Sequence, residues 1–228
     1  MPLAAVLYAI SVAIALVFGA AASAGQAPGP ATALSAAGFH ATVSAVDTAT
    51  RAGMIGVSWR TGCPVAIDDL RIIRMTYWGF DGAVHPAGEL MVNSGVADQV
   101  TAAFRTMFDA RFPIRQMRLI EHYGGSDDAS MAADNTSAFN CRPITGGGGF
   151  SVHSYGRAID VNTVENPYVK GTVVLPAAGE EFLDRADVRP GMIVAGGPTV
   201  AAFAAIGFDW GGSWNSPKDY QHFEAPGG

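Results

Sequence analysis

Two short segments far apart in the chain constrain its fold more than any other feature. The first, Ser151–Asp160, contains His153 and ends on Asp160. The second, Asp219–His222, places an aspartate three residues before a histidine. A hydrolytic zinc ion needs three protein ligands, an open position for water and a base beside that water. If the two segments meet, His153, Asp160 and His222 supply the ligands and Asp219 supplies the base.

Local patterns around the first segment favour such a site. Gly156 allows the backbone to turn between the two candidate ligands. The run Ala158–Val161 alternates as a half-buried strand does, which points Asp160 off one face. The glycines of 146–149 allow close backbone approach or a mobile lip beside the site.

The pattern S-x-H-x-x-G-x-A-x-D resembles the signature of the zinc D-alanyl-D-alanine carboxypeptidase family of bacterial cell-wall peptidases. The family's second motif places an acid three residues before the last zinc histidine, as Asp219 and His222 do. The stretches 135–142 and 166–168 are also similar to the family. The five matching positions of the signature are Ser151, His153, Gly156, Ala158 and Asp160.

The resemblance implies an α+β fold of the hedgehog/D,D-peptidase-like type. In such a fold a small central antiparallel sheet carries the zinc site and helices flank it. It also implies Zn²⁺ bound by His153, Asp160 and His222, with Asp219 as the general base. The substrates would be peptidoglycan stem peptides, and the first expectation is a D-alanyl-D-alanine carboxypeptidase.

Two further residues take expected roles from the resemblance. An arginine upstream of the first zinc histidine binds the substrate carboxylate in the family, and Arg142 lies in the matching stretch; a structural arginine is the alternative. A guanidinium can bind a carboxylate through two hydrogen bonds. A serine in the same block helps to hold the substrate, and Ser137 is the candidate here.

Three alternatives stay open. Family members that remove terminal D-alanine mostly carry Glu at the position of Asp219, so Asp resembles the subgroup that cuts between L-alanine and D-glutamate. A non-catalytic zinc-containing wall-binding domain would keep the fold without turnover. A plain secreted domain with chance motifs would bind no metal.

The amino-acid composition limits the classes of binding partner that we expect. The chain has 228 residues, of which 49% are hydrophobic and 15% charged, and its net charge is −6. This composition suits one globular domain with a sizeable core. Without a basic cluster, nucleic acid is not an expected partner. We expect a monomer.

The N-terminus predicts export. Residues 1–24 form an apolar run that ends in a small-residue cleavage pattern, so they are either a cleaved signal peptide or an uncleaved membrane anchor. Residues 25–37 form an Ala/Gly/Pro-rich linker, and residues 38–228 form the peptidase domain. We therefore expect the protein to be secreted, or held at the extracytoplasmic face of the membrane, and to act at the cell wall.

Cys63 and Cys141 are the chain's two cysteines. In an exported protein an even count favours a disulfide, and two buried free thiols are the alternative.

Apolar periodicity predicts the remaining elements. Strands are expected at 70–77, 89–92 and 114–120, helices at 94–110 and 198–206, and a polar loop at 126–131. A solvated loop is the first interpretation of 126–131, and carboxylates that bind a cation or a substrate amine are the alternative.

Overall fold

The computed structural model describes Met1 and residues 38–144 and 147–226. In these residues short helices accompany small antiparallel sheets, which confirms the mixed helix-and-strand class. The expected leader and linker lie outside the described residues, apart from Met1. Within the described part of the chain, no helix combines the length and apolarity needed to cross a bilayer.

The N-terminal sheet is antiparallel, with β2 between β1 and β3. Its strands are β1 (Ala41–Ala45), β2 (Leu70–Trp78) and β3 (Val84–Asn93). The period-two pattern of β2 buries both faces of the strand. Leu70 and Ile72 pack with Met54 on one face, whereas Ile73 and Met75 belong to the main core on the other.

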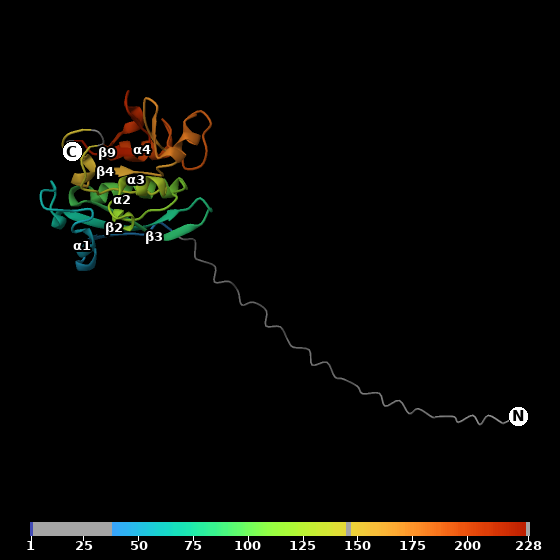
Figure 1. The fold of residues 1–228 in the computed structure, drawn as a ribbon, viewed down its shortest axis with the longest axis horizontal. Helices are drawn as coiled ribbons and strands as arrows, with labels where there is room; N and C mark the ends of the chain where they lie inside the picture. Colours follow the sequence, from blue (N-terminus) through green and yellow to red (C-terminus); the bar gives the residue numbers. More distant parts are fainter. Residues whose placement is uncertain (2–37, 145–146, 227–228) are drawn as a thin grey trace. The chain divides into compact units, whose positions relative to one another are not determined.

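Helices α2 (Ala97–Asp109) and α4 (Pro198–Ala205) connect this sheet to the candidate site. Helix α2 contacts β2 and α4, and α4 contacts β7. Phe104 of α2 packs edge-on against Phe203 of α4, and Phe203 stacks on Phe223 of β9 with ring centroids 4.1 Å apart. Figure 1 shows α2 between the strands β2 and β3 and the region of β4, β9 and α4.

Two further three-stranded sheets occupy the C-terminal half of the described chain. One has the order β4–β9–β7 and carries two of the candidate ligands; the other has the order β6–β5–β8. The antiparallel strands of the described residues thus divide among three small sheets, and the expected small antiparallel sheet that carries candidate ligands is the one formed by β4, β9 and β7. The strands are β4 (Ala158–Asp160), β5 (Tyr168–Lys170), β6 (Val173–Leu175), β7 (Asp209–Trp210), β8 (Lys218–Asp219) and β9 (His222–Glu224).

The expected strand at 114–120 does not form. Within the described chain the segment makes one isolated bridge, between Met117 and Thr136. Two of its backbone N–H groups donate to asparagine side chains instead. The N–H of Arg115 donates to Asn162 Oδ1 at 3.0 Å, and the N–H of Arg118 donates to Asn135 Oδ1 at 2.9 Å. Since these donors are already satisfied, no neighbouring strand is needed to pair with them.

The expected polar loop at 126–131 is largely helical. Helix α3 (Asp127–Ala132) begins after Ser126, whose hydroxyl oxygen accepts a hydrogen bond from the backbone N–H of Ala129 at 3.2 Å. Serine followed by acidic residues in the first turn is a helix-start pattern. The remaining helix, α1 (Thr48–Met54), lies between β1 and β2 in the sequence.

Candidate metal centre and active site

Strand pairing brings Asp160 and His222 together. They are directly opposed partners in the antiparallel pair of β4 and β9. The neighbouring residues Ile159 and Val161 are buried in the main core, so alternation turns the Asp160 side chain to the opposite face. Ser137 holds this strand from the other side: its N–H donates to the Asp160 carbonyl, and its carbonyl accepts from the Asp160 N–H, both at 2.9 Å.

His153 lies on a single 3₁₀ turn, Val152–Tyr155, immediately before β4. The hydroxyl of Ser151 caps the turn, and Gly156 ends it in the left-handed conformation, with φ of 67°. A β-carbon on Gly156 would also lie 2.6 Å from the backbone nitrogen of Asn93, so the position requires glycine for space as well as conformation. The turn therefore presses against the end of β3 and orients His153 toward β4.

The three candidate ligands form a compact cluster. His153 Nε2 lies 3.2 Å from His222 Nδ1 and 3.1 Å from Asp160 Oδ2, and His222 Nδ1 lies 3.1 Å from Asp160 Oδ1. All three side chains are buried. Three ligands about 2.0–2.1 Å from a tetrahedral Zn²⁺ are about 3.3 Å from one another, so the spacing suits such an ion.

Hydrogen bonds to the far sides of both rings orient them so that the cluster could hold a cation. His153 Nδ1 lies 2.6 Å from the carbonyl oxygen of Ala138, and His222 Nε2 lies 3.1 Å from a carboxylate oxygen of Glu224. If each of these nitrogens carries the proton, the two opposite nitrogens present lone pairs toward each other and toward Asp160. Three acceptors facing one another in a buried space are stable only around a positive charge.

Electrostatics agree with this arrangement. Burial alone would raise the pKa of the Asp160 carboxyl, but the charges and hydrogen bonds of His153 and His222 outweigh it and hold that pKa well below its usual range. Burial would lower the pKa of His222, but hydrogen bonds to Asp160 and Glu224 outweigh it and raise that pKa to about 10. The cluster thus favours a charged carboxylate and positive charge beside it.

Asp219 lies on β8 and faces the same pocket as the cluster. Its Oδ1 is buried and has no hydrogen-bond partner within the described residues. Burial raises the pKa of Asp219 to about 6, and the nearby Asp160 carboxylate adds to the rise. A β-carbon on Gly211 would lie 2.7 Å from the Asp219 carbonyl oxygen and 3.3 Å from the His222 β-carbon, so this glycine permits both segments to approach.

Residues 145–225 match the family model described as D-alanyl-D-alanine carboxypeptidase. This stretch is similar to that family. The match includes both motifs and confirms the resemblance inferred from the sequence. No curated protein and no solved structure gives a significant match.

The carboxypeptidase-family segment lines most of a pocket of about 390 Å³. His153, Asp160, His222 and Asp219 lie along it, and Trp214 forms part of the wall, with its ring centroid 5.5 Å from that of His222. A pocket of this size accommodates a short peptide segment rather than a large molecule.

Arg142 also lines the pocket, but it is not free. Its Nη2 lies 2.8 Å from a carboxylate oxygen of Asp127, the first residue of α3. Sequence reasoning treated Asp127 as part of a solvated loop and so missed this ion pair. The capping serine at 126 followed by two acidic residues indicates the helix that begins at Asp127, but it does not indicate the partner of Asp127.

Ser137 does not line the pocket. It is buried beside β4, where its backbone supports Asp160. Its role in contacting substrate stays a prediction, whereas its role in positioning a candidate ligand follows from the hydrogen bonds.

Gln221 is a further pocket residue that sequence reasoning missed. It lies between Asp219 and His222, is buried, and leaves its Oε1 without a hydrogen-bond partner in the described chain. An unpartnered amide oxygen in a pocket wall is suited to accept an N–H of a peptide substrate.

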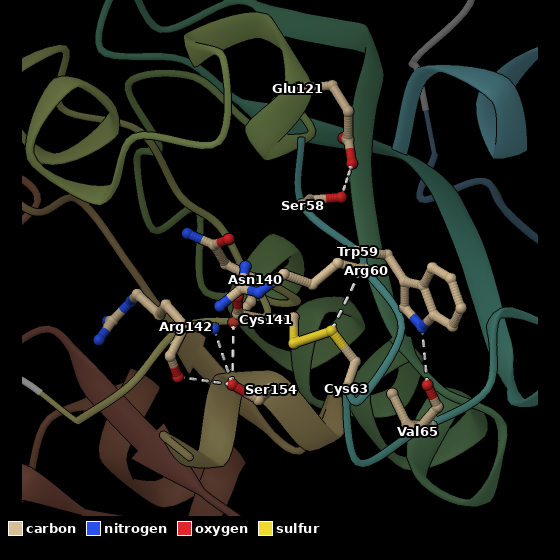
Figure 2. The surroundings of a disulfide bond; sticks show 10 residues. All are labelled: Ser58, Trp59, Arg60, Cys63, Val65, Glu121, Asn140, Cys141, Arg142 and Ser154. Atoms are coloured by element: carbon tan, nitrogen blue, oxygen red, sulfur yellow. Dashed lines mark hydrogen bonds between the residues drawn. A yellow bond between two sulfur atoms is a disulfide. The ribbon is translucent and has the colours of Figure 1, made fainter. Parts of the chain in front are cut away.

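A disulfide fixes the chain next to the pocket residue Arg142. Cys63 and Cys141 are joined, and Cys141 directly precedes Arg142. Figure 2 shows the adjoining hydrogen bonds: Ser154 Oγ accepts from the Arg142 N–H at 2.9 Å, and Arg60 donates to the Cys141 carbonyl at 2.9 Å. Because Ser154 follows His153, the same network connects the disulfide to the metal motif.

Proposed function

We propose that this protein is a zinc-dependent peptidase that hydrolyses peptidoglycan stem peptides, acting first as a D-alanyl-D-alanine carboxypeptidase. The observation that carries the proposal is the buried cluster of His153, Asp160 and His222 facing an unpartnered carboxylate oxygen of Asp219. The family match over 145–225 supports the reaction class. The proposal includes a hedgehog-like arrangement of the domain and action outside the cytoplasmic membrane.

The ligand set is suited to Zn²⁺. When bound, such an ion lowers the pKa of a water molecule and polarises a carbonyl. Ala138 and Glu224 hold the outer nitrogens of the two imidazoles, which keeps their inner lone pairs directed at one point. The buried surroundings exclude bulk water and strengthen each electrostatic interaction.

Asp219 is the proposed general base. Its free Oδ1 accepts a proton from the attacking water, and the resulting carboxylic acid passes that proton to the leaving amine. A pKa raised to about 6 by burial suits both halves of this transfer near neutral pH. Gln221 accepts a hydrogen bond from the substrate backbone beside the base.

One observation favours the endopeptidase as a second candidate. A carboxypeptidase must bind the terminal carboxylate of its substrate, yet Arg142 already pairs with Asp127. An enzyme that cuts inside the peptide, between L-alanine and D-glutamate, has no terminal carboxylate to hold at this position. Asp rather than Glu at 219 favours the same candidate by resemblance.

Product masses distinguish the candidates. Zinc-loaded protein is incubated, with and without chelator, with a stem pentapeptide ending in D-alanyl-D-alanine and with the same peptide carrying a C-terminal amide. A carboxypeptidase releases one alanine from the acid and leaves the amide intact. An endopeptidase cuts both peptides between L-alanine and D-glutamate. If zinc binds and neither peptide yields a chelator-sensitive product, the protein is not a peptidase of stem peptides.

A further inference from the structure

The pairing of Asp127 with Arg142 places both charges on the wall of the pocket that holds the metal cluster. The Asp127 side chain is 23% exposed and the Arg142 side chain 20% exposed, so both are accessible but largely removed from water. His153, Asp160 and His222 line the same pocket, so the pair shares a cavity with the candidate metal ligands.

Neither charge is fully satisfied by the other. In the described chain, Asp127 has no hydrogen bond from the backbone or from a second side chain, and Arg142 leaves its buried Nε without a partner. Burial raises the pKa of the Asp127 carboxyl in spite of Arg142, which agrees with an incompletely solvated carboxylate. Both residues therefore retain capacity for a ligand.

The free-energy cost of breaking the Asp127–Arg142 ion pair determines which kind of ligand can bind there. A ligand with only a carboxylate would bind Arg142 and leave Asp127 as an unpaired, largely buried charge. A ligand with only an amine would do the reverse to Arg142. Leaving one partner of a buried ion pair uncompensated is strongly destabilising. A ligand that carries both charged groups on one carbon atom satisfies both residues and avoids this cost.

We propose that Asp127 and Arg142 form a subsite for the zwitterionic head group of an α-amino acid at the end of a substrate side chain. Arg142 binds the carboxylate and Asp127 binds the ammonium. A residue of the diaminodicarboxylic acid class in a stem peptide presents such a head group. This inference rests on the proposed function, because the subsite and the metal cluster share one pocket. It makes Asp127 a specificity-determining residue.

Three matched peptides test the subsite. Each contains a diaminodicarboxylic acid residue; one has a free side-chain amine and carboxylate, the second has the amine acetylated, and the third has the carboxylate amidated. Binding to full-length, metal-free protein is measured by calorimetry, so that turnover does not contribute. We expect the free peptide to bind at least about tenfold more tightly than either capped peptide, a difference typical of one lost ion pair in an interface.

Variants test whether Asp127 is the residue that causes the preference for the free amine. Asp127→Asn should reduce the preference for the free amine to about twofold or less, because the amide does not attract an ammonium as strongly. Asp128→Asn removes the same charge from the adjacent exposed position and should keep the full preference. The double variant Asp127→Asn/Arg142→Gln leaves no uncompensated charge and should bind all three peptides alike. Thermal unfolding verifies that each variant is folded.

The outcomes separate the two proposals. If wild-type protein binds the acetylated peptide as tightly as the free one, or if Asp127→Asn keeps the preference, the subsite is disproved. Chelator-sensitive hydrolysis of all three peptides at equal rates disproves the subsite and leaves the peptidase. Selective binding that depends on Asp127, with no hydrolysis by zinc-loaded protein, supports the subsite and disproves the peptidase.

Discussion

His222 Nε2 lies 3.1 Å from a carboxylate oxygen of Glu224, two residues further along β9, so that the other ring nitrogen faces His153 and Asp160. With the proton on the outer nitrogen, the inner nitrogen presents its lone pair to the point where a metal ion would bind. Glu224→Gln should weaken zinc binding about 10- to 100-fold, as is typical when a partner of a metal-bound histidine is lost. Competition with a chromophoric chelator measures the change.

The exposed Glu180 provides a control for the loss of charge. Glu180→Gln should leave zinc affinity unchanged. Equal affinities for the Glu224→Gln variant and the wild type would mean that Glu224 does not orient His222.

Asp219→Asn should separate metal binding from turnover. Asp219 lies outside the ligand cluster, so the variant should retain stoichiometric zinc. It should lose about 10²–10⁴-fold in kcat, the usual contribution of a general base. Metal content is measured by atomic absorption and kcat with the stem pentapeptide. A variant that keeps wild-type kcat would show that another group accepts the proton.

The disulfide should contribute to stability and to the pocket. Cys63 and Cys141 are 78 positions apart, and closing a loop of that length typically contributes about 2–5 kcal/mol through the unfolded state. Cys63→Ser/Cys141→Ser should therefore lower the denaturant midpoint. Because Cys141 precedes Arg142, KM should rise more than kcat falls. The wild type under reducing conditions should behave like the double variant; a reduced protein with an unchanged midpoint would contradict the expectation.

Glu165 should give the fold a measurable pH dependence. It is buried beside Asp134 and pairs with the exposed Arg115, and burial followed by the Asp134 carboxylate raises the pKa of Glu165 to about 8 from 4.5. The folded state thus keeps a proton that the unfolded state releases at lower pH. The stabilisation from this group is fully present below pH 4.5 and is lost as pH rises toward about 8.

Glu165→Gln imitates the protonated form and should remove that part of the slope. Thermal unfolding between pH 4.5 and 8 measures the difference between the variant and the wild type. The exposed Glu181→Gln should follow the wild type. If Glu165→Gln also parallels the wild type throughout this range, Glu165 ionises in the folded protein much as it does in the unfolded chain.

The candidate site could be predicted from sequence because its candidate ligands and base lie in two short motifs. Alternation around Asp160 correctly indicated a strand with the carboxylate on one face. What the motifs did not indicate is how Asp160 and His153 are held, since Ser137 and Ala138 do this through backbone atoms. Every residue type has a backbone N–H and C=O, so such contacts leave no pattern in a single sequence.

Other differences have equally local causes. The apolar run at 114–120 has strand-like composition, but Asn135 and Asn162 supply the hydrogen bonds that a strand partner would supply. Asp127 is polar enough to suggest a solvated loop, yet its ion pair with Arg142 draws it into the pocket wall. In both cases a partner distant in sequence decides the outcome, and propensity alone does not identify that partner.

The close approach of Gly156 to Asn93 has a consequence for protein engineering. Together with the contacts from Ser137 and Ala138, it means that the motif Ser151–Asp160 depends on chain that precedes the family-matched stretch. A graft of 145–225 alone onto a foreign scaffold would contain the candidate ligands without the backbone contacts that hold them in place. A transferable version of the candidate site must therefore include 137–140 and the C-terminal end of β3.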